Sequence, residues 1–539
     1  MTIIRALVAR TWTRREMAWL AAGALGLAVV MFWPLVLHLG SDVPKDFGDP
    51  LSQAWQLAWG GHALTHQPLD FFEANQFWPG QDTLALSDAL VGYAPLSVFG
   101  TGVEAAVARY GAVFLLASAL AFAGAYALAR ELGLRPAAAC VAGAAFAYSP
   151  WRLEQGGHLH ILSSGAIPLA LAFLVAGYRR DRGGLVYSGW ALVAWQVSIG
   201  FSLGLPLLLA LAVGAPLVWW LLGRPIVAPR ATAAGVATVL VVTALLAVPY
   251  VRVRNDEPDA SRSPSTVAAY SVGPRVFATA SSLNPVWGPV TSRSGLPAVP
   301  EQTLFLGVAT FLLAILGATW QGWPRGLRLG LVGAALVFAV LSLGFEVSGL
   351  GRFLPYRALY EVVPGWSGIR VPERLHTFTT LALALLAAAG ASRRRWLAPV
   401  AVVAILVEGA GFGPGRWYPH PPAPRAPAGL AAVRAPLLQL PAAADDSRRY
   451  LLWSTDGFPR MVNGRSSITP QRTQRILAAV NGFPDRVSVA ALRRLGLKSV
   501  VLHADRLAGT PWEQWRSRPV APLGITRRVD GSLVVYDLR

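Results

Sequence analysis

Apolar runs separated by short polar segments fill the chain up to about residue 412. A helix needs about 20 apolar residues to cross the roughly 30 Å hydrocarbon core of a bilayer. Runs of this kind occur near residues 17–38, 109–129, 136–150, 161–178, 186–222, 231–250, 303–320, 327–345, 376–391 and 396–412. The block 186–222 is too long for one span at about 1.5 Å per residue. We expect a hairpin around "QVSIGFS", which brings the number of predicted spans to eleven.

Arginine clusters between the runs predict the orientation, because short cytoplasmic loops carry excess positive charge. With eleven spans, "RTWTRRE", "ARELGLRP", "YRRDRGG", "GRPIVAPR", "WPRGLR" and "SRRRW" all fall on one side. The N-terminus is then cytoplasmic, and its first apolar run is a retained span because no small-residue cleavage site follows it. Everything after about residue 413 is expected to be extracytoplasmic.

This orientation places three sizeable loops on the outer face, at residues 39–92, 251–302 and 346–375. In the first, "PLSQAWQLAWGGHAL" repeats Leu and Trp at helical spacing, which predicts an amphipathic helix lying on the membrane surface. The same pattern fits a helix packed on the mouth of the bundle, with no role in substrate binding.

The chain changes character after a Pro-rich extended linker at residues 413–427. In residues 428–539, "RRYLLWST", "LKSVVLHA" and "SLVVYDL" read as short buried strands, and "TPQRTQRILAAV" and "RVSVAALRRLG" as helices. The sequence thus predicts a small mixed α/β domain after a transmembrane domain at 1–412. It contains no phosphate-loop, dinucleotide or zinc motif, so a binding or stabilising role is expected.

Composition supports a multi-pass membrane protein: 54% of the 539 residues are hydrophobic and 14% are charged. The net charge of +19 lies mostly in short clusters between apolar runs. Topology explains these clusters better than nucleic-acid binding does. The abundance of Arg, Ala, Gly and Pro is typical of a bacterial chain, which places the protein in the inner membrane.

Two carboxylates, Asp46 and Asp49, follow the first predicted span in "SDVPKDFGDP". They can be a solvated loop in which Asp49 caps the helix that begins with Pro50. Alternatively, one is a general base for a reaction at the membrane surface, or the two bind a divalent metal such as Mg²⁺ or Mn²⁺.

This arrangement resembles the GT-C class of integral membrane glycosyltransferases. The stretches "DFGDPLSQAWQLAW", "LALSDALVGYAPL", "AYSPWRLEQGGHLHILSSGAIPLALAFL" and "LPYRALYEVVPGWSGIRVPERLHTFTTLALALLAAAG" are similar to poorly characterised bacterial multispanning proteins grouped near that class. The acidic spacing here is D-x-x-D, whereas the class more often has an adjacent or alternate pair. We assign Asp49 as the catalytic base, with Asp46 supporting it.

The resemblance implies transfer of a sugar from a polyprenyl-phosphate donor to an extracytoplasmic glycan, lipid or protein, with inversion at C1. The leaving phosphate needs cationic donors. Candidates are Arg357, Arg370 and Arg374, although Glu361 and Glu373 can pair with them instead. Asp88 is a further candidate, with a helix cap at Ser87-Asp88 as its alternative.

The segment "SPWRLEQGGHLHIL" adds Arg152, His158 and His160 on the same side of the membrane. The His-x-His pair is expected to hydrogen-bond substrate or a neighbouring loop, because no third metal ligand is visible nearby. Two other functions remain open. A transporter or flippase would need ionisable residues near mid-bilayer; a scaffold that has lost activity would keep the bundle alone.

Overall fold

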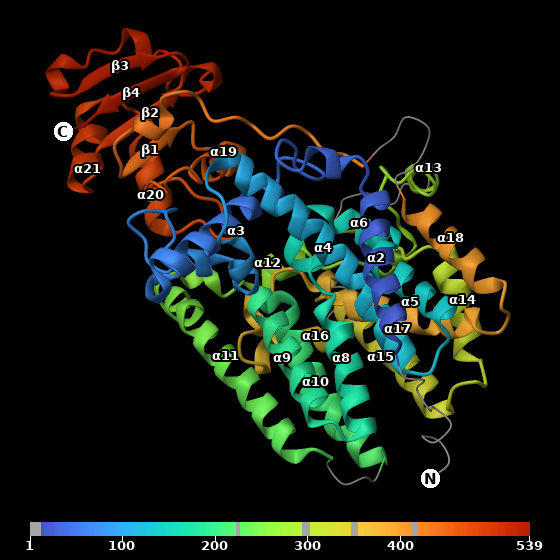
Figure 1. The fold of residues 1–539 in the computed structure, drawn as a ribbon. Coiled ribbons are helices and arrows are strands. Elements are labelled where there is room, and N and C mark those ends of the chain that lie inside the picture. The colour runs from blue at the N-terminus through green and yellow to red at the C-terminus, as the bar shows by residue number, and fades with distance from the viewer. Residues whose placement is uncertain (1–11, 223–226, 294–301, 346–353, 411–417, 539) are drawn as a thin grey trace. The chain divides into compact units, whose positions relative to one another are not determined.

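The computed structural model describes residues 12–222, 227–293, 302–345, 354–410 and 418–538. Figure 1 shows the helices and strands in chain order, from blue to red. Their contacts divide the chain into two compact units. Unit 1 comprises Met1–Leu37, Val113–Leu246 and Ser261–Pro419, and unit 2 comprises His38–Ala112, Ala247–Ala260 and His420–Arg539. Each unit is described by itself.

Every apolar stretch predicted as a span contains a helix. These helices are α2 (Arg14–Met31), α4 (Gly102–Glu131), α5 (Pro136–Tyr148), α7 (Leu159–Leu162), α8 (Ala166–Arg180), α9 (Gly183–Ile199), α10 (Phe201–Leu222), α11 (Pro229–Asp256), α14 (Val308–Ala318), α15 (Arg325–Ser342), α17 (His376–Ala391) and α18 (Leu397–Gly409). The predicted break within 186–222 is confirmed, because α9 ends at Ile199 and α10 begins at Phe201.

Five segments of the described chain are long and apolar enough to cross a membrane: Gly102–Glu131, Leu159–Arg180, Pro229–Asp256, Arg325–Ser342 and Pro372–Ala391. α11 exposes Leu240, Val241 and Leu245 by more than half. An apolar helix exposed in this way is stable in lipid rather than in water. The chain is therefore a multi-pass membrane protein, while the count of eleven spans stays a prediction.

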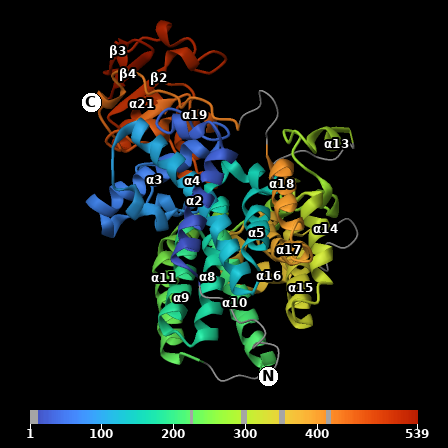
Figure 2. The same cartoon turned by 45° about the vertical axis from the view of Figure 1, so that its right-hand side comes forward.

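Unit 1 is a helical bundle in which α9 packs against both α8 and α10, and α17 packs against α5, α14 and α15. Figure 2 shows α14, α15 and α17 side by side. Glycines permit the closest approach, since a Cβ at Gly317 of α14 would lie 1.8 Å from the carbonyl oxygen of Leu386 in α17. Shorter helices connect the bundle: α6 (Pro150–Glu154), α12 (Pro264–Ala269), α13 (Gly288–Arg293) and α16 (Pro355–Val362).

Glu408, an acidic residue in the last predicted span, has a structural explanation. Its carboxylate accepts hydrogen bonds from the backbone N–H groups of Val308 at 2.9 Å and Ala309 at 3.1 Å. These N–H groups open α14 and have no partner within that helix. Glu408 therefore caps α14 from a neighbouring helix.

In unit 2, the predicted amphipathic helix forms as α3 (Asp49–His66), but it does not lie on a surface. Every residue from Pro50 to Gly61 is buried. α3 is covered by the 3-10 helix Val91–Ser97 and by α19 (Ala444–Trp453). The prediction of a surface-lying helix is wrong, because the polar residues Ser52, Gln53 and Gln56 are buried together with Trp55 and Trp59.

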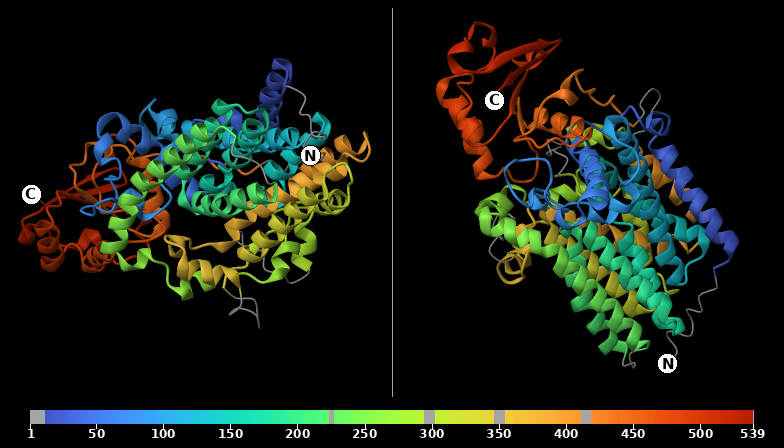
Figure 3. Two further views of the ribbon diagram at one scale, coloured as in Figure 1. Left: turned by 90° about the horizontal axis from the view of Figure 1, so that it is seen from below. Right: turned by 60° about the vertical axis from the view of Figure 1, so that its left-hand side comes forward.

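The C-terminal part of unit 2 holds a four-stranded sheet in the order β1-β2-β4-β3. β1 (Leu437–Leu440) is parallel to β2 (Ser499–His503), whereas β4 (Leu533–Asp537) is antiparallel to β2 and to β3 (Thr526–Asp530). α20 (Gln471–Ala479) and α21 (Arg486–Arg494) form as predicted. Figure 3 shows the sheet, in red and orange, from two further sides.

One strand prediction in this region is wrong, because "RRYLLWST" belongs to helix α19. Four consecutive residues, Tyr450 to Trp453, are buried in it, and a short apolar run of this kind cannot be told from a strand by periodicity. Asp445 and Asp446 in the first turn favour the helix, since carboxylates stabilise its N-terminus.

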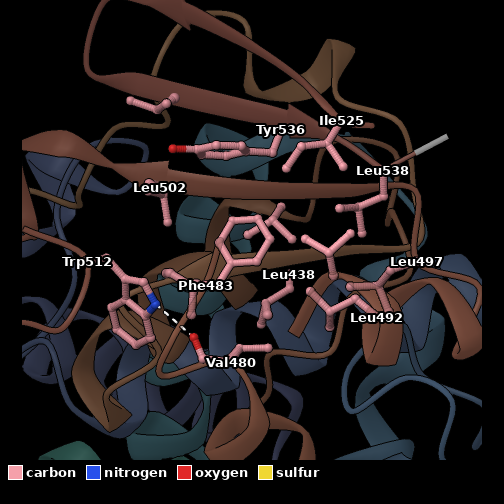
Figure 4. Close-up of a cluster of buried hydrophobic side chains, with 14 of the residues drawn as sticks. Leu438, Val480, Phe483, Leu492, Leu497, Leu502, Trp512, Ile525, Tyr536 and Leu538 are labelled. Carbon is pink, nitrogen blue, oxygen red and sulfur yellow. Dashed lines mark hydrogen bonds between the residues drawn. The ribbon is translucent and has the colours of Figure 1, made fainter. Parts of the chain in front are cut away.

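A hydrophobic core lies between one face of the sheet and the helices α20 and α21 (Figure 4). Phe483 and Tyr536 meet edge to face with ring centroids 5.1 Å apart. Trp512 is held by a hydrogen bond from its indole N–H to the carbonyl of Val480 at 3.0 Å.

We expect His503 to make this domain sensitive to acid. Its ring nitrogen is 2.9 Å from Oε1 of Gln439, and burial lowers the pKa of His503 to about 4. The imidazole of the unfolded chain has a pKa near 6.5. The contribution of neutral His503 to the free energy of unfolding is therefore full above about pH 6.5 and decreases as the pH falls from 6.5 toward 4. We expect a loss of about 2 kcal/mol at pH 5.

Hydrogen exchange of β1 and β2 in the full-length protein, corrected for intrinsic rates, measures this loss. His503→Gln keeps a polar partner for Gln439 and removes the titration. The free energy of opening of β1 and β2 should differ less between pH 7.5 and pH 5 in this variant than in wild type. An equal difference in both proteins would mean that other groups cause the acid sensitivity.

Candidate active site

The two predicted carboxylates differ in their surroundings. Asp46 Oδ1 accepts a hydrogen bond from the N–H of Gly48 at 2.8 Å. Gly48 is the N-cap of α3, so the expectation that Asp49 is the cap is wrong: Asp49 is the first helical residue and Pro50 follows it. A Cβ at residue 48 would lie 2.9 Å from Asp46 Oδ1. Asp46 therefore fixes the turn that leads into the helix.

Asp49 presents its carboxylate from the first turn of α3. The side chain is 41% exposed, and its Oδ1 is 3.6 Å from Nη2 of Arg448 in α19. Arg448 also pairs with Asp445 at 2.6 Å. Since the helix behind Asp49 is buried for three turns, the carboxylate is reachable and yet held by a rigid support.

Sequence reasoning missed another acidic group close by in the chain. Asp42 is buried, accepts a hydrogen bond from Ser41 at 2.6 Å and lies 2.8 Å from Nδ1 of His420. Burial would raise the pKa of Asp42, but these hydrogen bonds outweigh it and hold that pKa below its usual value. His420 comes from the linker, where backbone bonds join Val43 to Pro421 and Ala423 to Ser41.

In unit 1, the structure brings several predicted residues together. The ring centroids of His158 and His160 are 5.9 Å apart. Arg374 and Arg370 are both near enough for their positive charges to interact electrostatically with His160. The guanidinium of Arg370 lies 4.9 Å from the ring centre of Tyr270. This cluster combines two cations with two imidazoles, a suitable set for an anionic group.

Two other predicted arginines have structural partners. Arg152 is buried and donates to the carbonyl oxygens of Ile161 at 3.0 Å and Leu162 at 2.9 Å. Arg357 forms an exposed ion pair with Glu361 at 2.9 Å on α16, which is the alternative that the sequence left open. We therefore leave both out of the proposed site.

Asp88 in unit 2 follows a short 3-10 helix and does not cap one, since the next 3-10 helix has Leu90 as its N-cap. Its backbone oxygen accepts a hydrogen bond from Gln56 of α3 at 3.2 Å, and its charge acts on Tyr250. Asp88 thus lies beside α3, the helix that carries Asp49.

Comparison with solved structures identifies the fold. Two cryo-EM structures of the arabinofuranosyltransferase AftD from Mycobacteria match with TM-scores of 0.54, at 17% and 18% identity. Each match covers 98% of this chain and 42% of that chain. The fold is of the GT-C type.

A structure of the Archaeoglobus fulgidus oligosaccharyltransferase is more distant, with a TM-score of 0.46 and 13% identity over 91% of this chain and 70% of that one. No protein-family model matches the sequence, and no curated protein matches it. The GT-C resemblance inferred from the sequence is confirmed as a fold. The chain spans less than half the length of AftD, and at these identities the likeness concerns the fold alone.

The predicted residues of this GT-C fold fall in both units. Asp46, Asp49 and Asp88 belong to unit 2, whereas the histidine and arginine candidates belong to unit 1. Among the described residues, no three His, Cys, Asp or Glu side chains form a metal-binding cluster. A metal ion at Asp46 and Asp49 would therefore have to take its other ligands from carbonyl oxygens or water.

Proposed function

We propose that this protein is a membrane glycosyltransferase that moves a sugar from a polyprenyl-phosphate donor to an extracytoplasmic glycan, lipid or protein, with inversion. It would act in a bacterial inner membrane, with its N-terminus in the cytoplasm and its C-terminal domain outside. The GT-C fold supports transferase chemistry in general, and Asp49 is the observation that carries the proposal for this chain.

Asp49 meets the requirements of a general base. It is a partly exposed carboxylate on the first turn of a buried helix, directly after the first predicted span, and Arg448 lies 3.6 Å away. The base must reach a hydroxyl of the acceptor, and its position must not vary between turnovers. Asp46 supports this position through the turn at Gly48.

In the proposed step, Asp49 takes the proton of the acceptor hydroxyl while that oxygen attacks C1 of the sugar. The bond between C1 and the phosphate oxygen breaks, and the polyprenyl phosphate leaves with the electron pair. Attack from the face opposite the leaving group inverts the anomeric centre. Asp49 is then protonated and returns its proton to solvent.

From the composition of unit 1 alone, the cluster of Arg370, Arg374, His158 and His160 is our proposal for a phosphate-binding group. Arginine binds phosphate oxygens in a bidentate manner, and imidazole rings add N–H donors.

The test is a comparison of glycans and lipid-linked sugars in cells that carry wild-type protein, Asp49→Asn or the double variant Asp46→Asn/Asp49→Asn at equal expression. We expect one glycan species to disappear and its polyprenyl-phosphate donor to accumulate. An unchanged profile in the double variant would remove the transferase proposal and favour a transporter or a scaffold.

A further inference from the structure

Unit 2 contains a cavity of about 60 Å³ at the C-terminal end of α3, away from Asp49 in the sequence. Its lining includes His62 and His66 of α3, residues 97, 98 and 100–102 of the segment that leads into α4, Arg109 of α4 and Phe458. The volume admits a group the size of one phosphate.

Two residues that line this cavity, Arg109 and His62, have side-chain donors without a protein acceptor among the described residues. Arg109 is only 9% exposed, and its Nη2 donates to the carbonyls of Phe99 and Gly100. Within the part of the chain that the structure describes, neither its Nε nor its Nη1 has a protein acceptor. The imidazole ring of His62 likewise has aromatic neighbours but no hydrogen bond to a described residue, although its backbone carbonyl accepts from Thr65.

The cavity also lacks a negative charge. None of its described lining residues is acidic, and no described carboxylate forms an ion pair with Arg109. A largely buried cation without a counter-ion is unfavourable, because two carbonyl dipoles and the water that reaches the cavity replace only part of its lost hydration. An anion that enters the cavity would supply the missing partner.

A metal ion fits this site less well. The rings of His62 and His66 are stacked, with centroids 4.5 Å apart and planes only 18° apart. The lone pairs of imidazole nitrogens lie in the ring plane, so nearly parallel stacked rings do not direct them at one ion. The adjacent guanidinium would also repel a cation.

The loop beside the cavity is apolar and exposed. Ser97, Val98 and Gly100 line the cavity, while their neighbours Leu96 and Phe99 are 57% and 79% exposed. α4, a candidate span of 30 residues, begins at Gly102. At about 1.5 Å per residue it matches a bilayer including its headgroup layers, which puts Gly102 at headgroup level.

We infer that this cavity binds the headgroup phosphate of an anionic membrane phospholipid, with Leu96 and Phe99 inserted among its acyl chains. Arg109 pairs with the phosphate, and His62 donates a hydrogen bond to it. The site would anchor the end of α3 that is opposite to Asp49. It does not depend on the proposed transferase activity.

The experiment is native mass spectrometry of the full-length protein released from micelles that contain equimolar phosphatidylglycerol and phosphatidylcholine. Wild type should retain phosphatidylglycerol preferentially. Arg109→Gln should weaken this binding about tenfold or more, since it removes a charge-assisted hydrogen bond. Arg472→Gln, an exposed arginine on α20, is the matched control and should bind as wild type does.

His62→Leu separates lipid binding from folding, because it leaves the bonds of Arg109 to the loop intact. We expect a threefold or greater loss of phosphatidylglycerol in this variant. Wild-type retention in both His62→Leu and Arg109→Gln would overturn the proposal.

Two further arms distinguish the source of the phosphate. Leu96→Ser/Phe99→Ser should lose phosphatidylglycerol if the acyl chains contribute. If inorganic phosphate displaces the lipid and this double variant binds normally, the site takes a free anion instead. If polyprenyl phosphate displaces phosphatidylglycerol at equal concentration, the cavity belongs to the donor lipid; either result contradicts the phospholipid site.

Discussion

Replacing Asp49 with asparagine is expected to lower the rate of sugar transfer by about 10²–10⁴-fold, the usual contribution of a general base. Asparagine has the same shape and keeps the first turn of α3, but its amide does not accept the proton of the acceptor hydroxyl. Initial rates with the donor identified by lipid profiling, in vesicles of purified protein, measure the effect. Donor affinity should be nearly unchanged, because Asp49 acts on the acceptor.

Asp46→Asn is the matched control for this prediction. The amide oxygen of asparagine still accepts the N–H of Gly48, so the turn before α3 persists. We expect less than a tenfold loss of rate. If Asp46→Asn loses most activity while Asp49→Asn keeps it, the two roles are reversed; if neither variant changes the rate, the proposal that rests on Asp49 as the base is wrong.

The helices of this protein could be predicted from the sequence because each depends on a local pattern. Apolar runs fit the thickness of a bilayer, and a helix in lipid must satisfy its backbone groups within itself. Even the break at Gly200 was visible, since polar residues interrupt the block 186–222. Arg357 and Glu361 were recognisable as a pair because they lie four residues apart on one helix.

Contacts between distant segments could not be predicted in this way. Asp42 and His420 are 378 residues apart, and no local pattern links them. α3 has the periodicity of a surface helix, yet α19 covers it. Arg152 was a reasonable candidate for substrate binding until its carbonyl partners, nine and ten residues later, were known. Roles of this kind are decided by packing, which a single sequence does not report.

Gly317→Ala is expected to destabilise unit 1 by about 3 kcal/mol, the upper end of what overpacking usually costs. Its new Cβ would lie 1.8 Å from the Leu386 carbonyl oxygen, and a Cβ at Gly390 would lie 2.1 Å from that of Leu313. Both clashes are with backbone, so no side chain can rotate away. α14 and α17 must separate, and the close packing that small residues give membrane helices is lost.

Gly330→Ala makes the same change in α15, where a new Cβ meets nothing within 4 Å. Alanine is a better helix former than glycine by about 1 kcal/mol, so this variant should be as stable as wild type or slightly more stable. Thermal unfolding of both variants in the same detergent compares them. A loss of stability in Gly317→Ala together with no loss in Gly330→Ala would show that close packing between α14 and α17 requires Gly317. Equal changes in stability would mean that only helix propensity matters at residue 317.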